Sequence, residues 1–497
     1  ALKDNNGNDV NYTILESKDL TDYVLSQTIK LNPSKKVYTP ESVIEATIAI
    51  EAKDLPAMGY VQYTLDFSHS SKKELKESTK VENEFYSIHL EEDGTLTIVD
   101  KTNNHVYKNQ AVFEENGDGG DSFNYSPAHQ DLLTYSKEHL VDSSIQACDL
   151  YATLNAEYKL PIPSDLEERA LGKRSIEFPV KMSVSLRKGS PVIDFDVHVD
   201  NVGKSHRLCV VFDADLVSKV NIADEQFGAI ERENVHEKEM ALYNEALERA
   251  KTVKEEVNND LPVNFQQSDT TWQEPPISIE PTQSFVSLSN SERGIALIPQ
   301  GVREYEVIDD HAIRLTLFRT YSFMGKENLI YRPGRASGER IIETRDAELQ
   351  KPLDFSFGFT TFAGDFNSAH IANTAKAYNT PVVAREYSEF LNGRLIFSEP
   401  EVEGTKEDSY SLFSTENKLV VSAIKKAEDK DGYIIRLYNG QFHEEESDTL
   451  VFTQNIKKAY YVDLKEEYAD SIEVVDNTIQ VKPLTHCKFT TIYVETE

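Results

Sequence analysis

The sequence predicts a mainly β protein built from antiparallel β-sandwiches. Three observations support this fold class: short β-branched and aromatic runs alternate with polar residues, Gly, Asn and Asp separate these runs, and helical periods are few. Parallel strands would need a crossover helix between them, so antiparallel sheets are favoured. Of the 497 residues, 39% are hydrophobic and 10% aromatic, which is enough for several packed cores.

Strand signals are spread along the whole chain. Residues 42–52 alternate apolar and polar side chains, and residues 85–99 form a predicted hairpin around an Asp93-Gly94 turn. Two more strands are expected within residues 174–199, joined at Lys188-Gly189. Further strands are expected at residues 208–213, 284–288, 312–317, 355–361, 419–424, 433–438 and 489–494.

One long helix is expected, within residues 233–258. Met240, Tyr243, Leu247 and Ala250 recur near every three and a half positions, and the other faces are rich in Glu and Lys. We expect this helix to be exposed and to pack on the β core through Tyr243, Leu247 and Ala250. Its stripe is narrow, so it would cover a sheet edge or pair with another chain, and a homodimer is one arrangement it permits. A short helix is expected at residues 368–377.

The chain divides into three expected domains. Residues 68–79 are polar and aperiodic, which indicates a linker after a small β-sandwich at residues 1–69. Residues 378–385 close a central block at 70–380, and a last β-sandwich spans 381–497. The central block is large for one sandwich and predicts an enlarged two-sheet structure, a supersandwich, with the helix as an insertion.

Charge and cysteine content limit the partners of the chain. Its 85 acidic and 52 basic residues give a net charge of −33, which disfavours nucleic acid and membrane surfaces as partners. No apolar run approaches the roughly 20 residues that span a bilayer. Cys148, Cys209 and Cys487 are far apart and form no CxxC, so we expect free thiols and a cytoplasmic location.

A catalytic apparatus is hard to find in the sequence. The chain has no GxSxG, no phosphate-binding loop and no HExxH, and its closest histidines, His198 and His206, are eight apart. We therefore expect no metal or cofactor in this chain itself. Asp194, Asp196, His198 and Asp200 share one face of a strand and could hold a cation, but the solvated face of a half-buried strand is the favoured interpretation.

Residues 114–127, EENGDGGDSFNYSP, are the strongest candidate for a functional loop. Asp118 and Asp121 could accept hydrogen bonds from sugar hydroxyls, and Phe123 or Tyr125 could stack on a sugar ring. The glycines permit unusual backbone shapes and would let the loop protrude. A calcium loop and a self-capped Asp/Gly turn are the alternatives.

Two further segments complete the candidates. Arg332, in the sequence YRPGR, could bind a carboxylate in a bidentate fork or could sit in a solvated Pro-Gly turn. Residues 421–439 predict a hairpin with a charged EDKDG turn, and nothing in that hairpin requires catalysis.

Together these segments resemble the C-terminal half of glycoside hydrolase family 38, the bacterial α-mannosidase and mannosylglycerate hydrolase type. The family's GDxxNYSP pattern is similar to residues 120–127, its RPG stretch to residues 332–334, and its SALKKAEDGDGLILRLYN-like segment to residues 422–439. Residues 54–60, 227–232 and 301–307 also resemble family stretches. The match at 422–439 is specific, and the likeness runs from about residue 40 to the end of the chain.

The resemblance implies a retaining, exo-acting α-mannosidase built around zinc. In the family an N-terminal domain carries the zinc ligands, the nucleophile and the acid/base carboxylate, so a catalytic domain and a mannose-containing carbohydrate are the implied partners. The family's zinc motif, His-x-Asp soon followed by Trp, has no counterpart. His129 and His198 each precede an Asp by two positions, but the single Trp, Trp272, is far from both.

The resemblance also carries a few substrate-binding residues onto this chain. A family tyrosine at the rim of the mannose site matches Tyr125 best, with Asp121 and Asn124 flanking it, and Arg332 would make an interdomain contact. We expect the isolated chain to be inactive and to complete the active site of the whole enzyme. The alternatives are a mannosylglycerate hydrolase of the same family, a non-catalytic carbohydrate-binding β-sandwich protein and a purely structural module.

Overall fold

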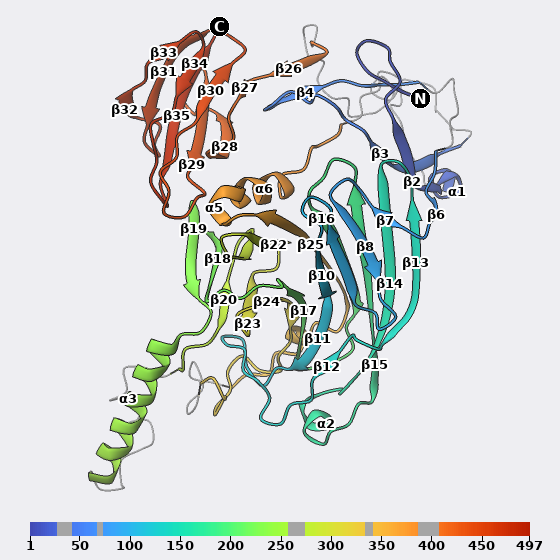
Figure 1. Ribbon diagram of the computed structural model, residues 1–497, viewed down its shortest axis with the longest axis vertical. Helices are drawn as coiled ribbons and strands as arrows, with labels where there is room; N and C mark the ends of the chain where they lie inside the picture. Colours follow the sequence, from blue (N-terminus) through green and yellow to red (C-terminus); the bar gives the residue numbers. More distant parts are fainter. Residues whose placement is uncertain (27–41, 67–72, 257–273, 333–340, 386–406) are drawn as a thin grey trace.

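The computed structural model describes residues 1–26, 42–66, 73–256, 274–332, 341–385 and 407–497 (Figure 1). Within these residues the strands form eight sheets whose neighbours pair antiparallel. Helices are few and mostly short. The mainly β, antiparallel fold class is therefore confirmed.

Two large sheets in the middle of the chain share one apolar core. The ten-stranded sheet has the order β19 (Gly228–Glu233), β18 (Val220–Glu225), β21 (Val286–Ser289), β22 (Arg293–Gln300), β25 (Pro352–Ala363), β16 (Ile193–Asp200), β15 (Ile176–Arg187), β14 (Tyr151–Ile162), β13 (Leu140–Ala147) and β6 (Lys76–Glu77). The six-stranded sheet has the order β12 (Thr134–Tyr135), β11 (Val112–Gly117), β17 (His206–Asp213), β24 (Ala312–Arg319), β23 (Glu304–Ile308) and β20 (Ile279–Pro281).

A four-stranded sheet adds its side chains to the same core. Its order is β10 (His105–Gln110), β9 (Leu96–Asp100), β8 (Tyr86–Leu90) and β7 (Val81–Glu82). The turn between β8 and β9 is the predicted one, because Gly94 adopts a φ of +84° that side chains disfavour. Gly189, with a φ of +78°, makes the turn between β15 and β16 in the same way.

The shared core is built from alternate residues of facing strands. Phe195 of β16 stacks on Phe357 of β25 with ring centroids 5.1 Å apart, and Phe212 of β17 meets Phe195 edge-on at 5.3 Å. All three rings are fully buried. Because successive side chains of a strand point to opposite faces, burying this set leaves the other set on the outer face of each sheet.

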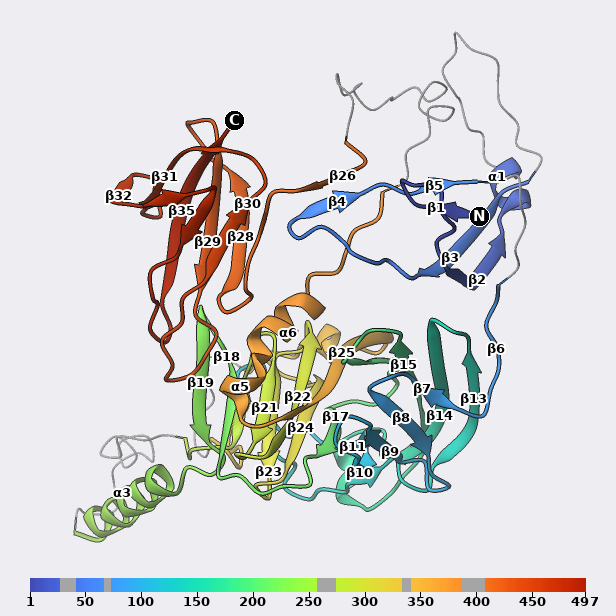
Figure 2. The same ribbon diagram turned by 45° about the horizontal axis from the view of Figure 1, so that its top comes forward.

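The long helix forms, but it does not lie where the sequence predicts. Helix α3 (Glu237–Glu256) projects away from the sheets in both views, whereas we expected it to pack on the β core (Figure 1, Figure 2). Tyr243 and Ala246 are buried, Leu247 is half-buried, and the Ala250 side chain lies outside the described residues. The apolar stripe predicted that a helix forms here, but it did not predict what the helix packs against.

The remaining helices are short. They are α1 (Thr21–Ser26), α2 (Leu166–Ala170), α5 (Phe366–Ala369), α6 (Ile371–Tyr378) and one 3-10 turn (Arg345–Glu348). The pair α5 and α6 replaces the single helix expected at 368–377, because His370 between them adopts a left-handed φ of +49°. Among the described residues, none of the helices has the length and apolarity needed to cross a bilayer.

Smaller sheets occupy the two ends of the chain. Near the N-terminus β1 (Leu2–Lys3) pairs with β5 (Thr64–Leu65), β2 (Tyr12–Asp19) with β3 (Ile44–Ile50), and β4 (Gly59–Val61) with the distant β26 (Ser409–Ser411). Towards the C-terminus one sheet has the order β27 (Phe413–Ser414), β30 (Thr449–Phe452), β34 (Thr478–Gln480) and β33 (Val474–Val475). The other has the order β28 (Val420–Lys426), β29 (Tyr433–Tyr438), β35 (Phe489–Thr496), β31 (Ile456–Val462) and β32 (Tyr468–Ser471).

The last two sheets enclose a core of their own, and a third core joins them to the centre. Phe413, Ile435 and Ile492 are among the fully buried residues of the C-terminal core. Helices α5 and α6 lie between the central and C-terminal sheets, and Ile371 of α6 packs in one cluster with Val420 of β28 (Figure 2). The domain bounds at residues 69/70 and 380/381 stay predictions.

Candidate functional site

The glycine-rich loop follows β11 and folds back on itself. Asp118 and Pro127 form an isolated antiparallel bridge, the Gly119 amide donates to the Ser126 carbonyl at 2.8 Å, and the Asp121 amide donates to the Asn124 carbonyl at 3.0 Å. Because residues 118–127 are bonded to one another in this way, the loop is a compact turn.

The glycines serve close packing, which differs from the protrusion that the sequence suggested. A Cβ on Gly120 would stand 2.1 Å from the Asn124 carbonyl oxygen, and one on Gly119 would stand 2.9 Å from the Pro127 oxygen. A Cβ on Gly117 would meet Arg169 Cδ at 2.6 Å. Side chains at Gly119 and Gly120 would therefore force the two limbs of the loop apart, and one at Gly117 would displace Arg169.

Two arginines from distant parts of the chain hold the loop. Arg319, at the end of β24, pairs with Asp118 through Nε and Oδ2 at 2.6 Å. Its Nη2 also donates to the backbone oxygens of Asp121 and Asn124, at 2.6 and 3.0 Å. Burial raises the pKa of the Asp118 carboxyl, and the charge of Arg319 counters that shift.

Arg332 makes the second buried pair, with Asp121. Its Nη1 also donates to Asn124 Oδ1 at 2.5 Å. Burial alone would raise the pKa of Asp121, but the pair with Arg332 and the amides of Lys326, Phe123 and Asn124 lower it below its ordinary value. The structure thus brings Asp121, Asn124 and Arg332 together and pairs them with one another.

These contacts change the roles expected for the same residues. Asp121 has no exposed surface and Arg332 is 5% exposed, so both side chains are buried. The bidentate carboxylate partner expected for Arg332 is Asp121 of its own loop cluster. Pro333 and Gly334 of the expected turn lie outside the described residues.

Tyr125 is also buried, with 7% of its surface exposed. The Arg207 guanidinium carbon lies 3.9 Å from the centre of the Tyr125 ring, and Tyr331 meets the ring edge-on at 6.1 Å. The exposed aromatic of the loop is Phe123, at 60%. With Arg207 over its ring, Tyr125 cannot stack on a sugar through that face, which corrects the expected protruding tyrosine.

The hydroxyl of Tyr125 remains available. It makes no hydrogen bond in the part of the chain that the structure describes, and it is not among the polar atoms sealed from solvent. Burial raises the pKa of this hydroxyl, and the positive charge of Arg207 opposes the shift. A neutral phenol in such a position can donate one hydrogen bond and accept others.

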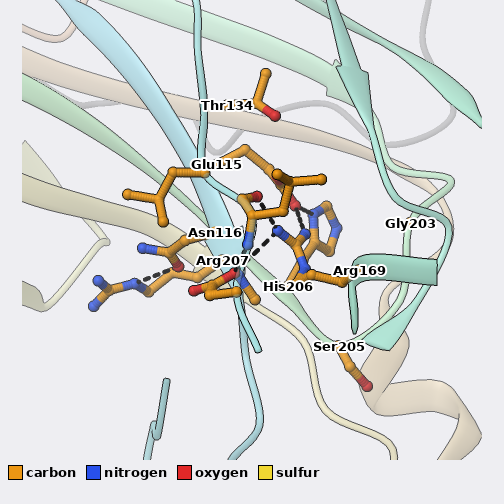
Figure 3. A network of polar contacts seen from close by, with 12 residues as sticks. Glu115, Asn116, Thr134, Arg169, Gly203, Ser205, His206 and Arg207 are labelled. Atoms are coloured by element: carbon orange, nitrogen blue, oxygen red, sulfur yellow. Dashed lines mark hydrogen bonds and ion pairs between the residues drawn. The ribbon is translucent and has the colours of Figure 1, made fainter. Parts of the chain in front are cut away.

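Behind the loop lies a buried network centred on Glu115 of β11 (Figure 3). Glu115 has no exposed surface and pairs with Arg169 of α2 and with His206 of β17, whose Nδ1 is 3.1 Å from Glu115 Oε1. Arg169 also contacts Asp131 Oδ1 at 3.2 Å, and that oxygen accepts the Gly117 amide at 2.9 Å. The network therefore anchors the base of the loop.

Both ring nitrogens of His206 face acceptors. Its Nε2 lies 2.9 Å from Asn201 Oδ1, and the Asn201 amide nitrogen is directed to the backbone oxygens of Glu348 and Leu349. The Asn201 oxygen must then be the atom that faces His206. Each ring nitrogen can therefore take part in a hydrogen bond, and Arg169 with Glu115 forms the buried ion pair at the centre of the network.

The outer face of the six-stranded sheet also carries charges. Arg314 of β24 pairs with Glu114 Oε2 at 3.1 Å and with Glu306 Oε2 at 2.7 Å, and Ser278 donates to the other Glu306 oxygen at 2.5 Å. These residues and the half-exposed Tyr135 line an open cleft of about 610 Å³. The charged groups on its floor pair with one another.

The other candidates from the sequence are structural. On β16, Asp194 pairs with Arg187 at 2.9 Å and Asp196 accepts from Ser356 at 2.6 Å, as on a solvated strand face. Within the described ranges, no group of three or more His, Cys, Asp or Glu side chains could hold a metal ion. The hairpin of β28 and β29 contributes to the C-terminal core.

Sequence reasoning missed Glu115, Arg169, His206, Arg207 and Arg319. The available signal was a charged residue inside an apolar strand, as in HRLCVVFD at the start of β17. Such a residue is costly to bury without a partner, so its presence predicts a paired site. The identity of the partner cannot be predicted this way, because Arg319 and Asp118 are 201 positions apart.

Comparisons with known proteins agree with this architecture. Residues 81–324 match the glycosyl hydrolases family 38 C-terminal domain, and residues 418–485 match the family 38 C-terminal beta sandwich domain. A protein of Halalkalibacterium halodurans named "Putative mannosylglycerate hydrolase" is 23% identical over 423 residues, which are 81% of this chain and 40% of that protein.

Solved structures give the same fold. An α-mannosidase from Enterococcus faecalis aligns with a TM-score of 0.73 and 18% identity over 99% of this chain and 50% of its own. A second family 38 glycosyl hydrolase from Enterococcus faecalis aligns with a TM-score of 0.69 and 17% identity over 99% of this chain and 52% of its own. The chain thus spans about half, or less, of the length of these relatives.

Proposed function

Because the chain belongs to glycoside hydrolase family 38, we propose that it is the C-terminal part of a retaining, zinc-dependent exo-α-mannosidase. In this proposal the enzyme removes terminal α-linked mannose from glycans or small mannosides. The chain supports the active site and completes it with residues of the loop at 118–127.

The observation that carries the proposal is the Tyr125 hydroxyl. Two buried ion pairs, Arg319 with Asp118 and Arg332 with Asp121, fix the loop around this tyrosine. Buried ion pairs contribute little net stability, so their concentration around one loop is better explained by a need for a defined loop shape. The tyrosine held in that shape offers a hydroxyl without an internal partner.

Zinc is proposed for the whole enzyme and not for this chain. The described residues include no group of three or more metal-binding side chains, so they do not fit a zinc site. We propose that an N-terminal catalytic domain supplies the zinc ligands, the nucleophile and the acid/base carboxylate. This chain alone is then expected to hold no stoichiometric zinc and to be inactive on aryl α-mannosides.

In this proposal the chain's part in the chemistry is to position a hydrogen-bond donor at the active site. Retaining glycosidases use two carboxylates and a covalent glycosyl-enzyme intermediate, and hydrogen bonds to the sugar strengthen as its ring distorts. In the proposal the Tyr125 hydroxyl donates one such bond to the mannose or to a carboxylate beside it. Arg332, Asp121 and Asn124 keep the tyrosine in place and do not touch the sugar.

A second candidate is hydrolysis of mannosylglycerate, and the name of the Halalkalibacterium halodurans relative favours it. The two candidates differ only in the group attached to mannose. The exposed Phe123 favours a third candidate, a carbohydrate-binding module without catalysis, in which that ring would stack on sugar.

The test uses the intact enzyme, meaning this chain together with its proposed catalytic domain. Initial rates on an aryl α-mannoside and on mannosylglycerate identify the substrate, and proton NMR of the first product identifies the anomer. Release of α-mannose first, lost on chelation and restored by zinc, is the expected result. Release of β-mannose first, or an unchanged rate after the metal is removed, would contradict the mechanism. Saturable sugar binding by this chain without any turnover by the intact enzyme would favour the binding module.

We also propose a cytoplasmic protein that acts on carbohydrate and not on nucleic acid or membranes. The net charge of −33 and three free cysteines support this proposal. Homodimer formation through α3 is a further proposal, and light scattering of the intact enzyme with and without residues 237–256 tests it.

A further inference from the structure

Arg207 differs from the other arginines around the loop. Arg319, Arg332, Arg314 and Arg169 each make a direct ion pair with a carboxylate. Arg207 is 2% exposed, yet its nearest carboxylate oxygen, Glu304 Oε1, is 3.9 Å from its Nη1, and neither atom has a hydrogen-bond partner. An ion pair at this distance does not explain why a guanidinium is buried here.

The contact that Arg207 does make is with Tyr125. Its guanidinium carbon lies 3.9 Å from the ring centre, within the range of a favourable cation–π contact. Its Nε donates to Asn116 Oδ1 at 3.3 Å, which fixes the guanidinium from the neighbouring strand. Asn116 and Arg207 are direct partners in the pairing of β11 with β17, so both belong to the rigid sheet.

The residue that pairs with Arg207 on the neighbouring strand holds the backbone of the loop. Arg207 pairs in register with Arg319 of β24, and Arg319 bonds the backbone oxygens of Asp121 and Asn124. Two neighbouring arginines of one sheet thus divide the work: Arg319 fixes the loop backbone and Arg207 fixes the ring that the loop carries. Tyr331 closes the ring from a second side.

We propose that Arg207 is a positioning residue that orients the Tyr125 hydroxyl towards the mannoside-binding site. This inference rests on the proposed function. A planar guanidinium over the ring restricts ring rotation, which a flexible aliphatic side chain would not do. Its positive charge also draws electron density from the phenol, so the hydroxyl becomes a better hydrogen-bond donor than burial alone would allow.

The kinetic test is a double-mutant cycle in the intact enzyme. Arg207→Met removes charge and plane, and Arg207→Lys keeps the charge beside Glu304 but removes the planar contact. We expect each to lower kcat/KM by about threefold to tenfold, the range for loss of a neutral hydrogen bond. In a Tyr125→Phe background the same substitutions should have almost no further effect, because the hydroxyl on which Arg207 acts is gone.

The matched control is Arg232→Met. Arg232 of β19, at the edge of the ten-stranded sheet, is a partly buried arginine that donates to the hydroxyl of another buried tyrosine, Tyr305, at 3.1 Å. It should leave kcat/KM within about twofold, or act additively with Tyr125→Phe. Equal effects of Arg207→Lys in both backgrounds would overturn the proposal, because they would mean that Arg207 acts through general stability.

A second arm uses this chain alone and does not depend on activity. In a crystal structure of the Arg207→Lys chain we expect the Tyr125 ring to turn or to lose defined density, while residues 118–124 stay fixed by Arg319. A Tyr125 ring in its original place would overturn the positioning role. If the ring moves but the intact enzyme cleaves no α-mannoside, the proposed function fails and the Arg207–Tyr125 relation stands.

Discussion

The two large sheets share a core but treat their outer faces differently. On the ten-stranded sheet, Asp196 and His198 alternate with buried Phe195 and Val197, and His198 Nδ1 lies 2.7 Å from the exposed Asp354. The surface there follows the simple rule that polar residues of a half-buried strand meet water. Little stability is expected from such contacts, because exposed ion pairs contribute about 0–1 kcal/mol.

The six-stranded sheet breaks that rule at the end where the loop lies. Asn116, Arg207 and Thr316 point to its outer face but are only 5%, 2% and 6% exposed. Tyr125 from the loop covers Arg207 there. Burying the Arg207 guanidinium is costly, so we take this costly face, at the end where the loop lies, as the one with a function.

The largest expected effect concerns Glu115, whose buried carboxylate contacts both Arg169 and His206. Glu115→Leu leaves the buried Arg169 without its anion, and breaking such a pair costs about 3–5 kcal/mol. Asp196→Asn on the ten-stranded sheet should cost less than about 0.5 kcal/mol. Thermal unfolding followed by circular dichroism should therefore show a large fall in Tm for the first variant only. Equal shifts would mean that the buried Glu115 network contributes no more stability than an exposed contact.

Arg319 offers a more local test. Arg319→Met leaves Asp118 buried and unpaired and frees two backbone oxygens of the loop, with an expected loss of about 3 kcal/mol. Hydrogen exchange should speed up in residues 117–127 more than in the strands. Lys181→Met is the matched control, because Lys181 pairs with Glu157 at 3.1 Å on the exposed face of the other large sheet. Exchange that rises equally across both sheets would mean that Arg319 stabilises the whole sandwich and not the loop.

The sequence predicted the outer face around β16 of the ten-stranded sheet well and the costly face of the six-stranded sheet poorly. Alternation over residues 193–200 predicts β16 and its solvated stripe correctly, because strand period and burial agree there. The same alternation over 206–213 predicts a strand, but it cannot reveal that Arg207 is covered, since the covering residue comes from a loop 82 positions earlier. The loop at 114–127 could be recognised by its composition. Its compact shape could not, because Arg319 and Arg332 that fold it lie about 200 positions away.

Asp121 gives a smaller effect with a defined pH dependence. Asp121→Asn weakens the contact with Arg332, with an expected loss of about 1–3 kcal/mol at pH 7 and a fall in activity as the loop loosens. The ion pair lowers the folded-state pKa of Asp121, so its stabilisation is complete above the unfolded value near 3.9 and is lost as pH falls through the folded pKa. The difference in Tm between the two proteins should therefore shrink below about pH 4. A difference that grows in acid would contradict the sign of this shift.

The smallest expected change separates function from stability most cleanly. Tyr125→Phe removes one hydroxyl that has no internal partner, so the fold loses no hydrogen bond and Tm should change by less than about 1 °C. If the hydroxyl bonds the mannoside or a catalytic carboxylate, kcat/KM of the intact enzyme should fall by about threefold to tenfold, or 0.5–1.5 kcal/mol.

Tyr151→Phe is the matching substitution on the other sheet, where the hydroxyl donates to Ser185 Oγ at 2.6 Å. It should do the reverse, with a small loss of stability and unchanged kinetics, because its hydroxyl already has a partner within the fold. The costly face would then be the functional one, because its buried charges hold the Tyr125 hydroxyl, a donor that makes no hydrogen bond within the described part of the fold. Unchanged kinetics with a lowered Tm for Tyr125→Phe would make Tyr125 an ordinary core tyrosine, and the contrast between the faces would be one of packing alone.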